Sequence, residues 1–212
     1  MISSGRGILV TFEGGEGCGK STQLTLLAAA IGDVAKMREP GSSPGAQTIR
    51  RLLTEGEPDR WDALTETLLL VAARRDFVER TLRPTLDSGA TVLCDRFTDS
   101  TVAYQGYAGG VDLRFIAALN DAATGGIVPD LTLVLDLPVD IGLDRALTRR
   151  GAETRFERKS KEFHQRVRDG FLTIANDNPK RCVVIDAAGS IEDVQRRINS
   201  AVTERLELTL HG

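Results

Sequence analysis

A short apolar strand followed by a glycine-rich loop and a helix is the feature that most constrains how this chain folds. Residues Ile8 to Phe12 are apolar and partly β-branched, which predicts a buried strand. The pattern Gly-x-x-x-x-Gly-Lys-Ser follows from Gly14 to Ser21, and an apolar-periodic helical segment comes after it. This order of elements is the context of a phosphate-binding P-loop. We therefore expect this stretch to bind the phosphates of a nucleotide.

The residue types of this loop suit that chemistry. Glycines let the backbone aim its N–H groups at a phosphate, and the helix N-terminus adds partial positive charge. We expect Lys20 to reach the β- and γ-phosphates and the hydroxyl of Ser21 to ligate Mg²⁺. A glycine-rich turn that matches by chance is the alternative. The expected nucleotide-contacting residues are Gly14, Gly15, Glu16, Gly17, Cys18, Gly19, Lys20, Ser21 and Thr22.

Length and composition predict one globular domain over residues 1–212. The chain is 41% hydrophobic and 27% charged, which is ordinary for a soluble protein. Its net charge of −3 gives no general attraction to nucleic acid or to an anionic membrane. The three cysteines lie far apart without metal-ligand spacing, and the N-terminus has no apolar targeting segment. We therefore expect reduced thiols and a cytoplasmic location.

Short apolar strands alternate with helical patterns along the whole chain. After the strand at 8–12, further strands are expected at 34–37, 91–94, 131–137 and 181–186. Helices are expected at 47–53, 63–82, 112–124, 141–148 and 191–206, and the segment 38–45 reads as a turn-rich loop. Because no hairpin signal separates the strands, the pattern predicts a parallel sheet of five strands with helices on both faces. The fold class is α/β, a three-layer P-loop NTPase-like fold.

A charged pair follows the strand at 91–94. Asp95 and Arg96 stand at its carboxyl end, which is the edge where open α/β sheets bind their ligands. Asp95 is therefore a candidate carboxylate for Mg²⁺, and Arg96 is a candidate phosphate clamp. An ion pair that merely closes the strand is the alternative.

The densest charge run lies between Arg145 and Arg168, with nine basic and three acidic residues. Such a run is usually a solvated helix face. Here Gly151 and Ala152 interrupt it, which favours a mobile arginine-rich lid over about residues 145–160 that brings arginine to a transferring phosphate.

The sequence lacks the motifs of a GTP-dependent switch. It contains no Asn-Lys-x-Asp guanine reader, and no Asp-x-x-Gly follows the third strand. Size and strand number favour a small-molecule kinase instead.

The chain resembles bacterial thymidylate kinases over nearly its whole length. The residues that carry the resemblance are Phe12–Thr22, Arg38–Gly41, Ala72–Arg74, Asp95–Arg96, Ser100, Ala103–Gly106, Pro129–Thr132 and Arg155–Glu157. The resemblance implies transfer of the γ-phosphoryl group of ATP to dTMP, with Mg²⁺, in a cytosolic homodimer that serves dTTP synthesis. A kinase of another nucleoside monophosphate and a non-catalytic nucleotide sensor are the alternatives.

The resemblance also implies roles for single residues. Glu16 matches the acid that holds the 3′-hydroxyl of dTMP, Arg74 the arginine on the thymine carbonyl, and Tyr104 the ring that crowds the 2′ position. Arg96 matches the monophosphate clamp, and Gly17 stands where one subtype carries a catalytic arginine, so the lid is expected to supply it. The implied catalytic residues are Lys20, Arg96, Arg149, Arg150 and Arg155, and the implied substrate residues are Glu16, Arg38, Leu70, Arg74, Arg96, Ser100, Thr101, Tyr104 and Gln105.

Two positions depart from the family pattern. Leu70 stands where the family usually has a phenylalanine that stacks on thymine. Gly109 stands where the family often has an arginine. Phe77 or Tyr107 are alternative sources of the stacking ring, and both departures bear on substrate affinity more than on reaction type.

Overall fold

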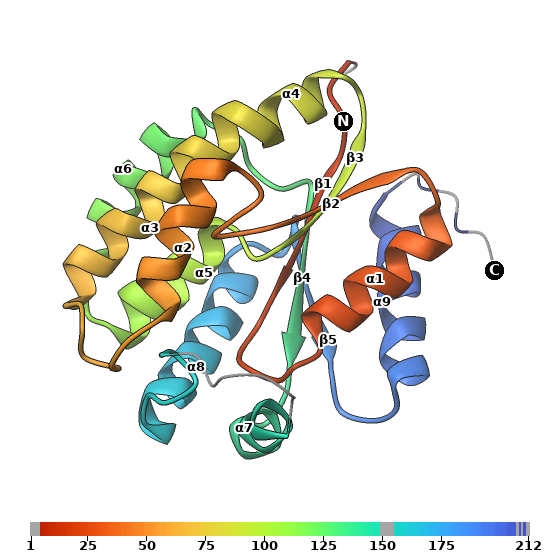
Figure 1. Cartoon of the computed structure of the whole chain (residues 1–212). Helices are drawn as coiled ribbons and strands as arrows, with labels where there is room; N and C mark the ends of the chain where they lie inside the picture. The colour runs from red at the N-terminus through yellow and green to blue at the C-terminus, as the bar shows by residue number, and fades with distance from the viewer. Residues whose placement is uncertain (1–4, 149–154, 207, 209, 211–212) are drawn as a thin grey trace.

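The sheet of this protein has five parallel strands, as predicted (Figure 1). The computed structural model describes residues 5–148, 155–206, 208 and 210. The strands are β1 (Leu9–Glu13), β2 (Val34–Arg38), β3 (Thr91–Asp95), β4 (Leu131–Asp136) and β5 (Cys182–Asp186). They lie in the order β2-β3-β1-β4-β5, so the strand that leads into the glycine loop is central. The chain thus reverses its winding direction beside β1, where open α/β sheets bind ligands.

Helices cover both faces of the sheet (Figure 1). On one face, α1 (Lys20–Ile31) and α9 (Ile191–Arg205) pack on β1, β4 and β5 around an aliphatic core. On the other face, α3 (Ala63–Phe77) and α4 (Arg83–Asp87) cover β1, β2 and β3, while α8 (Lys161–Asp177) covers β4 and β5. Two outer helices, α2 (Pro44–Thr54) and α6 (Leu113–Thr124), pack against α3. Three layers result, as the sequence predicts.

Two helical segments widen into π-helix. The predicted helix at 63–82 is α3 up to Phe77, and it continues as the π-helical η1 (Val78–Leu82) directly into α4. The short α5 (Thr98–Thr101) likewise runs into the π-helical η2 (Val102–Ala108). Such π segments are rare and often mark functional sites, and η2 carries Tyr104 and Gln105.

One predicted loop is shorter than the sequence suggests. The interpretation of 38–45 as loop is wrong at its end, because α2 begins at Pro44 rather than at Gln47. The Ser43 side chain caps the helix by accepting from the N–H of Ala46, and proline suits the first helical position because its ring fixes φ.

The strands before the site extend by one residue beyond their predicted ends. β2 reaches Arg38 and β3 reaches Asp95, and these two residues are register partners. Phe12 in β1 is the other register partner of Asp95. The sheet therefore aligns the ends of β1, β2 and β3 at one edge.

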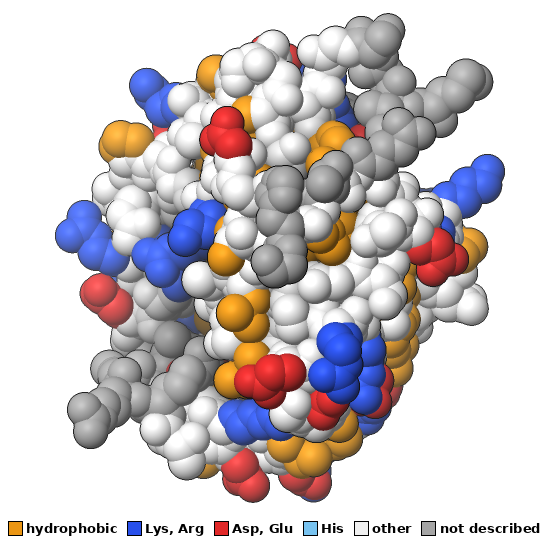
Figure 2. Space-filling view, turned by 90° about the vertical axis from the view of Figure 1, so that its right-hand side faces the viewer, with side chains coloured by type: hydrophobic (Ala, Val, Ile, Leu, Met, Phe, Trp, Pro, Cys, Tyr) orange, Lys and Arg blue, Asp and Glu red, His pale blue; other side chains and the backbone are white. Residues whose placement is uncertain are grey.

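The face over α1 and α9 presents charged side chains of both signs, with hydrophobic side chains scattered between them (Figure 2). Among the described residues, no helix combines the length and the apolar character that a membrane span needs.

Candidate functional site

A cleft opens at the carboxyl ends of the central strands. Its walls come from the glycine loop at Glu16, the segment after β2 at Glu39 and Pro40, and the helices α2, α3 and η2. The predicted phosphate loop thus contributes to the wall of the cleft.

The glycine loop joins β1 to α1 and holds Lys20 close to its own backbone. The Lys20 ammonium donates to the carbonyl oxygens of Gly14 at 3.1 Å and Gly15 at 2.7 Å, and it lies 3.4 Å from the Cys18 sulfur. Gly19 precedes α1 with a left-handed backbone (φ +94°) and has no side chain to accept from the first-turn N–H groups. Those N–H groups and the lysine form a cradle that suits an anion.

Ser21 and Asp95, the two residues predicted to face Mg²⁺, contact each other. The Ser21 hydroxyl in the first turn of α1 donates to the Asp95 carboxylate at the end of β3, at 2.7 Å. Hydroxyl and carboxylate oxygens are donors that suit Mg²⁺, which keeps waters and phosphate oxygens as its other ligands. Within the described part of the chain, no group of three or more His, Cys, Asp or Glu side chains could hold a metal ion by itself.

Arg96 joins the glycine loop to the wall of the cleft. Its guanidinium donates to the carbonyl of Gly14 and the hydroxyl of Ser100, both at 3.1 Å. It also contacts Glu16 at 3.0 Å and the hydroxyl of Tyr104 at 3.1 Å. Arg96 has a left-handed backbone (φ +71°), which is uncommon for a residue with a side chain and is typical of functional sites. One arginine therefore brings together four predicted site residues.

The electrostatics of Glu16 follow from these contacts. Burial would raise the pKa of Glu16, but Arg96, then Lys20 and the hydroxyl of Tyr104, lower that pKa to about 2. Burial raises the pKa of the Tyr104 hydroxyl well above its ordinary value, so it keeps its proton and donates to Glu16 at 2.8 Å. Glu16 is therefore an ionised acceptor at neutral pH.

Glu13 at the end of β1 holds the turn that carries Arg96. Its carboxyl oxygens accept from the Phe97 backbone N–H at 2.7 Å and from the Ser100 hydroxyl at 2.6 Å. The side chain is fully buried. Burial raises the pKa of Glu13 to about 8, and the nearby Asp99 adds to the effect. No sequence pattern indicates this role, because the contact depends on how β1 and β3 are aligned.

Arg74 lies at the bottom of the cleft and is almost fully buried. Its guanidinium forms an ion pair with Glu39 and donates to the hydroxyl of Thr101 at 2.9 Å and the Phe97 carbonyl at 3.2 Å. Leu70, one turn earlier on α3, also lines the cleft. Arg74, Thr101 and Leu70 thus lie together in the lining of the cleft.

Six residues that line the cleft were absent from the predicted set, namely Glu39, Pro40, Arg50, Thr54, Phe97 and Phe156. Arg50 of α2 lines it and donates to the carbonyl of Pro40 at 2.9 Å. The signal was present, because Arg50 shares a helical face with the buried Ala46 and Leu53. Phe97 and Phe156 also line the cleft, whereas Phe77 is buried in the core.

Of the remaining predicted residues, some line the cleft and others lie outside it. The alternative that Phe77 or Tyr107 supplies a ring to the cleft is wrong for Phe77, which packs in the core, and Tyr107 packs on Gly170 of α8. Arg38 is exposed at the end of β2, outside the lining of the cleft. Gln105 lines the cleft, and Thr22 lies in the first turn of α1.

The candidate lid arginines divide into two groups. Arg155 is fully buried and pairs with Glu66 at the start of α3. Arg149 and Arg150 lie outside the described residues.

Comparisons with known proteins show what this chain is similar to. A sequence profile of the thymidylate kinase family matches residues 12–198. The chain is 54% identical to the thymidylate kinase of Caulobacter vibrioides over 207 residues, which covers 96% of this chain and 99% of that protein. It is 51% identical to that of Afipia carboxidovorans, over 97% and 93% of the two chains. The crystal structure of thymidylate kinase from Ehrlichia chaffeensis matches with a TM-score of 0.75 and 34% identity, over 94% and 98% of the two chains.

Proposed function

The chain belongs to the thymidylate kinase family, and from this premise we propose that it transfers the γ-phosphoryl group of ATP to dTMP, giving dTDP and ADP. The observation that carries the proposal is the position of Arg96. Its guanidinium contacts both the carbonyl of Gly14 in the phosphate loop and the side chains of Glu16, Ser100 and Tyr104 in the cleft. One cation thus stands between a donor subsite and an acceptor subsite, as phosphoryl transfer requires.

The phosphate loop supplies the donor subsite. The N–H groups of the loop and of the first turn of α1 bind the ATP phosphates, and Lys20 leaves the carbonyls of Gly14 and Gly15 for the β- and γ-phosphates. The Ser21 hydroxyl and the Asp95 carboxylate, whose oxygens are 2.7 Å apart, would hold Mg²⁺, which would neutralise phosphate charge. Cys18, Gly19 and Thr22 shape the loop and the helix start.

The cleft supplies the acceptor subsite. Arg96, with Arg50 beside it, clamps the monophosphate of dTMP, and Ser100 orients the clamp. The ionised Glu16 accepts from the 3′-hydroxyl, and Arg74 reads the thymine carbonyl while Leu70 packs on the ring. Catalysis then consists of holding the two phosphates in line and of neutralising the charge that develops between them.

We place the remaining transition-state cation in the lid, at Arg149 or Arg150. Gly17 in the phosphate loop offers no charge there. An arginine that meets the transferring phosphoryl group raises kcat by about 10³-fold or more.

We also propose that the enzyme works as a homodimer. Leu64 and Leu68 on α3 and Phe115 on α6 are apolar yet 44–47% exposed, and the two helices pack against each other. Their outer surface suits a second copy of the chain. Sedimentation of the protein and of Leu68→Glu tests this, since a monomeric wild type would contradict it.

We assign the reaction to the cytoplasm because the three cysteines, Cys18, Cys94 and Cys182, are free and buried. Unpaired thiols are typical of a reducing compartment.

The test is an assay of ADP release with ATP, Mg²⁺ and one acceptor at a time. The acceptors are dTMP, dUMP, dGMP, CMP and AMP, and the quantity compared is kcat/KM. We expect dTMP to give the highest value. A higher value for another acceptor would favour the alternative of a different nucleoside monophosphate kinase. Binding of dTMP without turnover of any acceptor would favour a nucleotide sensor.

A further inference from the structure

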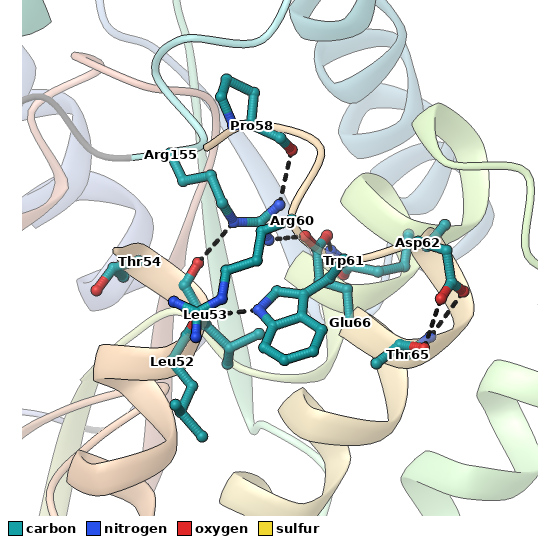
Figure 3. A network of polar contacts seen from close by, with 12 residues as sticks. Leu52, Leu53, Thr54, Pro58, Arg60, Trp61, Asp62, Thr65, Glu66 and Arg155 are labelled. Atoms are coloured by element: carbon teal, nitrogen blue, oxygen red, sulfur yellow. Dashed lines mark hydrogen bonds and ion pairs between the residues drawn. The ribbon is translucent and has the colours of Figure 1, made fainter. Parts of the chain in front are cut away.

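A buried ion pair connects Arg155, within the predicted lid at about residues 145–160, to Glu66 near the start of α3 (Figure 3). The guanidinium of Arg155 contacts the carboxylate of Glu66, and both side chains are excluded from solvent. The same guanidinium donates to the carbonyl of Leu53 at 3.0 Å and to the carbonyl of Pro58 at 2.8 Å. Since arginine stays charged, a buried guanidinium needs such partners, and removing it from them is costly.

Residues 155–158, here called the strap, dock as a unit on the end of α2 and the loop after it. The backbone N–H of Arg155 donates to the carbonyl of Thr54 at 3.1 Å. Arg158 donates to the carbonyl of Gly56 and reaches Glu57 at 3.3 Å. From the other side, Phe156 of the strap packs against the hydrophobic cluster that includes Val167 and Phe171 of α8. The strap therefore bridges α2 and α8.

The strap contributes a wall to the acceptor cleft. Phe156 lines the cleft, and its ring lies edge-on against Tyr104 with the ring centroids 5.9 Å apart. The guanidinium of Arg155 covers the Phe156 ring at 4.9 Å. The buried ion pair thus fixes an aromatic side chain that faces the acceptor.

Glu66 connects the ion pair to a second residue of the cleft. Its other carboxylate oxygen accepts from the side-chain amide of Gln105 at 2.6 Å. The amide oxygen of Gln105 is buried, and no group in the described part of the chain bonds to it. Gln105 also lines the cleft, so Glu66 fixes the orientation of an amide side chain in the cleft wall.

We propose that Arg155 is a positioning residue for the acceptor: through Glu66 it fixes the strap, and so sets the places of Phe156 and Gln105 in the cleft. In this proposal Arg155 does not contact the transferring phosphoryl group, because it is fully buried and its guanidinium is directed at Leu53, Pro58 and Glu66. The proposal rests on the proposed function, and it assigns Arg155 to dTMP affinity rather than to the chemical step.

The test measures dTMP binding calorimetrically and steady-state kinetics in Arg155→Met, Arg155→Lys and Glu66→Gln. We expect Arg155→Met to weaken dTMP binding by about tenfold or more, with kcat at saturating dTMP and the KM for ATP changed less than about threefold. Glu66→Gln keeps an oxygen that can accept from the Gln105 amide. Its dTMP affinity should therefore lie between that of Arg155→Met and that of the wild type. Lysine keeps the positive charge but lacks the planar guanidinium with its several N–H donors. Arg155→Lys should therefore retain only part of the wild-type dTMP affinity.

Arg158→Met is the matched control. Arg158 lies on the same strap, but its ion pair with Glu57 is exposed, so we expect dTMP affinity close to that of the wild type. A fall in kcat of about 10³-fold in Arg155→Met with unchanged dTMP affinity would overturn the proposal, because that is the behaviour of an arginine on the phosphoryl group. Unchanged kcat and affinity would also overturn it.

A measurement on the wild-type protein covers the case in which a variant does not fold. Hydrogen exchange of a peptide that spans residues 155–163 should slow when dTMP is added without ATP. Protection that needs ATP would contradict the proposal. If the wild type prefers another acceptor, the proposed function fails, and the same measurements with that acceptor still decide the role of Arg155.

Discussion

Gly17 of the phosphate loop and Gly142 of α7 (Val139–Leu147) pack backbone against backbone. A Cβ atom built on Gly17 would lie 1.9 Å from the carbonyl oxygen of Gly142, and Gly17 has φ +66°. The start of α7 thus closes the space beside the loop. An arginine at position 17 would therefore require α7 to move. This agrees with the proposal that the catalytic arginine comes from the lid, which follows α7 in the chain.

The first prediction concerns this contact. Gly17→Ala should lower the free energy of unfolding by about 1–3 kcal/mol, because the methyl group meets backbone and the backbone conformation disfavours a side chain. Denaturant unfolding of the two proteins measures the difference. Gly15→Ala is the matched control, since a Cβ atom there meets nothing within 4 Å. Equal free energies of unfolding for Gly17→Ala and the wild type would contradict the prediction, because they would mean that α7 can shift away from the loop without loss of stability.

The second prediction separates donor from acceptor. Lys20→Ala should lower kcat by about 10²-fold or more, because it removes a cation from the phosphates on which charge develops. Binding of dTMP alone should change little, since Lys20 contacts the carbonyls of Gly14 and Gly15 and lies outside the lining of the cleft. Calorimetric titration of Lys20→Ala with dTMP measures whether the dTMP affinity is unchanged. A loss of dTMP affinity as large as the loss of kcat would contradict this division.

The third prediction concerns Leu70. Leu70→Phe should lower the KM for dTMP by about 2- to 10-fold with kcat little changed, because an aromatic face adds about 0.5–1.5 kcal/mol beyond apolar area. Steady-state kinetics test it, and a raised KM would mean that the ring overpacks a cleft already lined by Phe97 and Phe156. In contrast, Phe77→Leu should lower stability without a selective effect on KM, since Phe77 is fully buried in the core.

The fourth prediction is a pH dependence of stability. Burial raises the pKa of Glu13 from 4.5 to about 8, so between these values the folded protein holds a proton that the unfolded chain has lost. The folded state binds more protons there, and the contribution of Glu13 to stability is therefore complete below pH 4.5 and is lost as pH rises toward 8.

Glu13→Gln removes this titration. The free energy of unfolding, measured by denaturant between pH 5 and pH 8, should decline less with rising pH in the variant than in the wild type. Parallel profiles would show that Glu13 does not titrate in this range. Because Gln still offers an oxygen to the Phe97 N–H, the variant should keep the turn at Arg96.

Part of the site could be predicted because its residues are neighbours in the chain. The phosphate loop is one continuous segment between a strand and a helix, so its pattern specified Lys20 and Ser21 directly. Asp95 and Arg96 followed from their place at a strand end, and the parallel sheet then aligned Asp95 with Phe12 and brought it to Ser21.

The sequence by itself thus determined the five-stranded fold, the phosphate loop and the edge of the sheet that carries the site, since periodicity and local motifs encode all three. Only the tertiary structure decided which partners the charged side chains take. Arg155 and Glu66 are 89 residues apart, and their pairing exists only once α3 and the strap pack together. A charge run looks the same in sequence whether its arginines face solvent, phosphate or a buried carboxylate. The environment that distinguishes them, burial from water beside a particular acceptor, is created by folding.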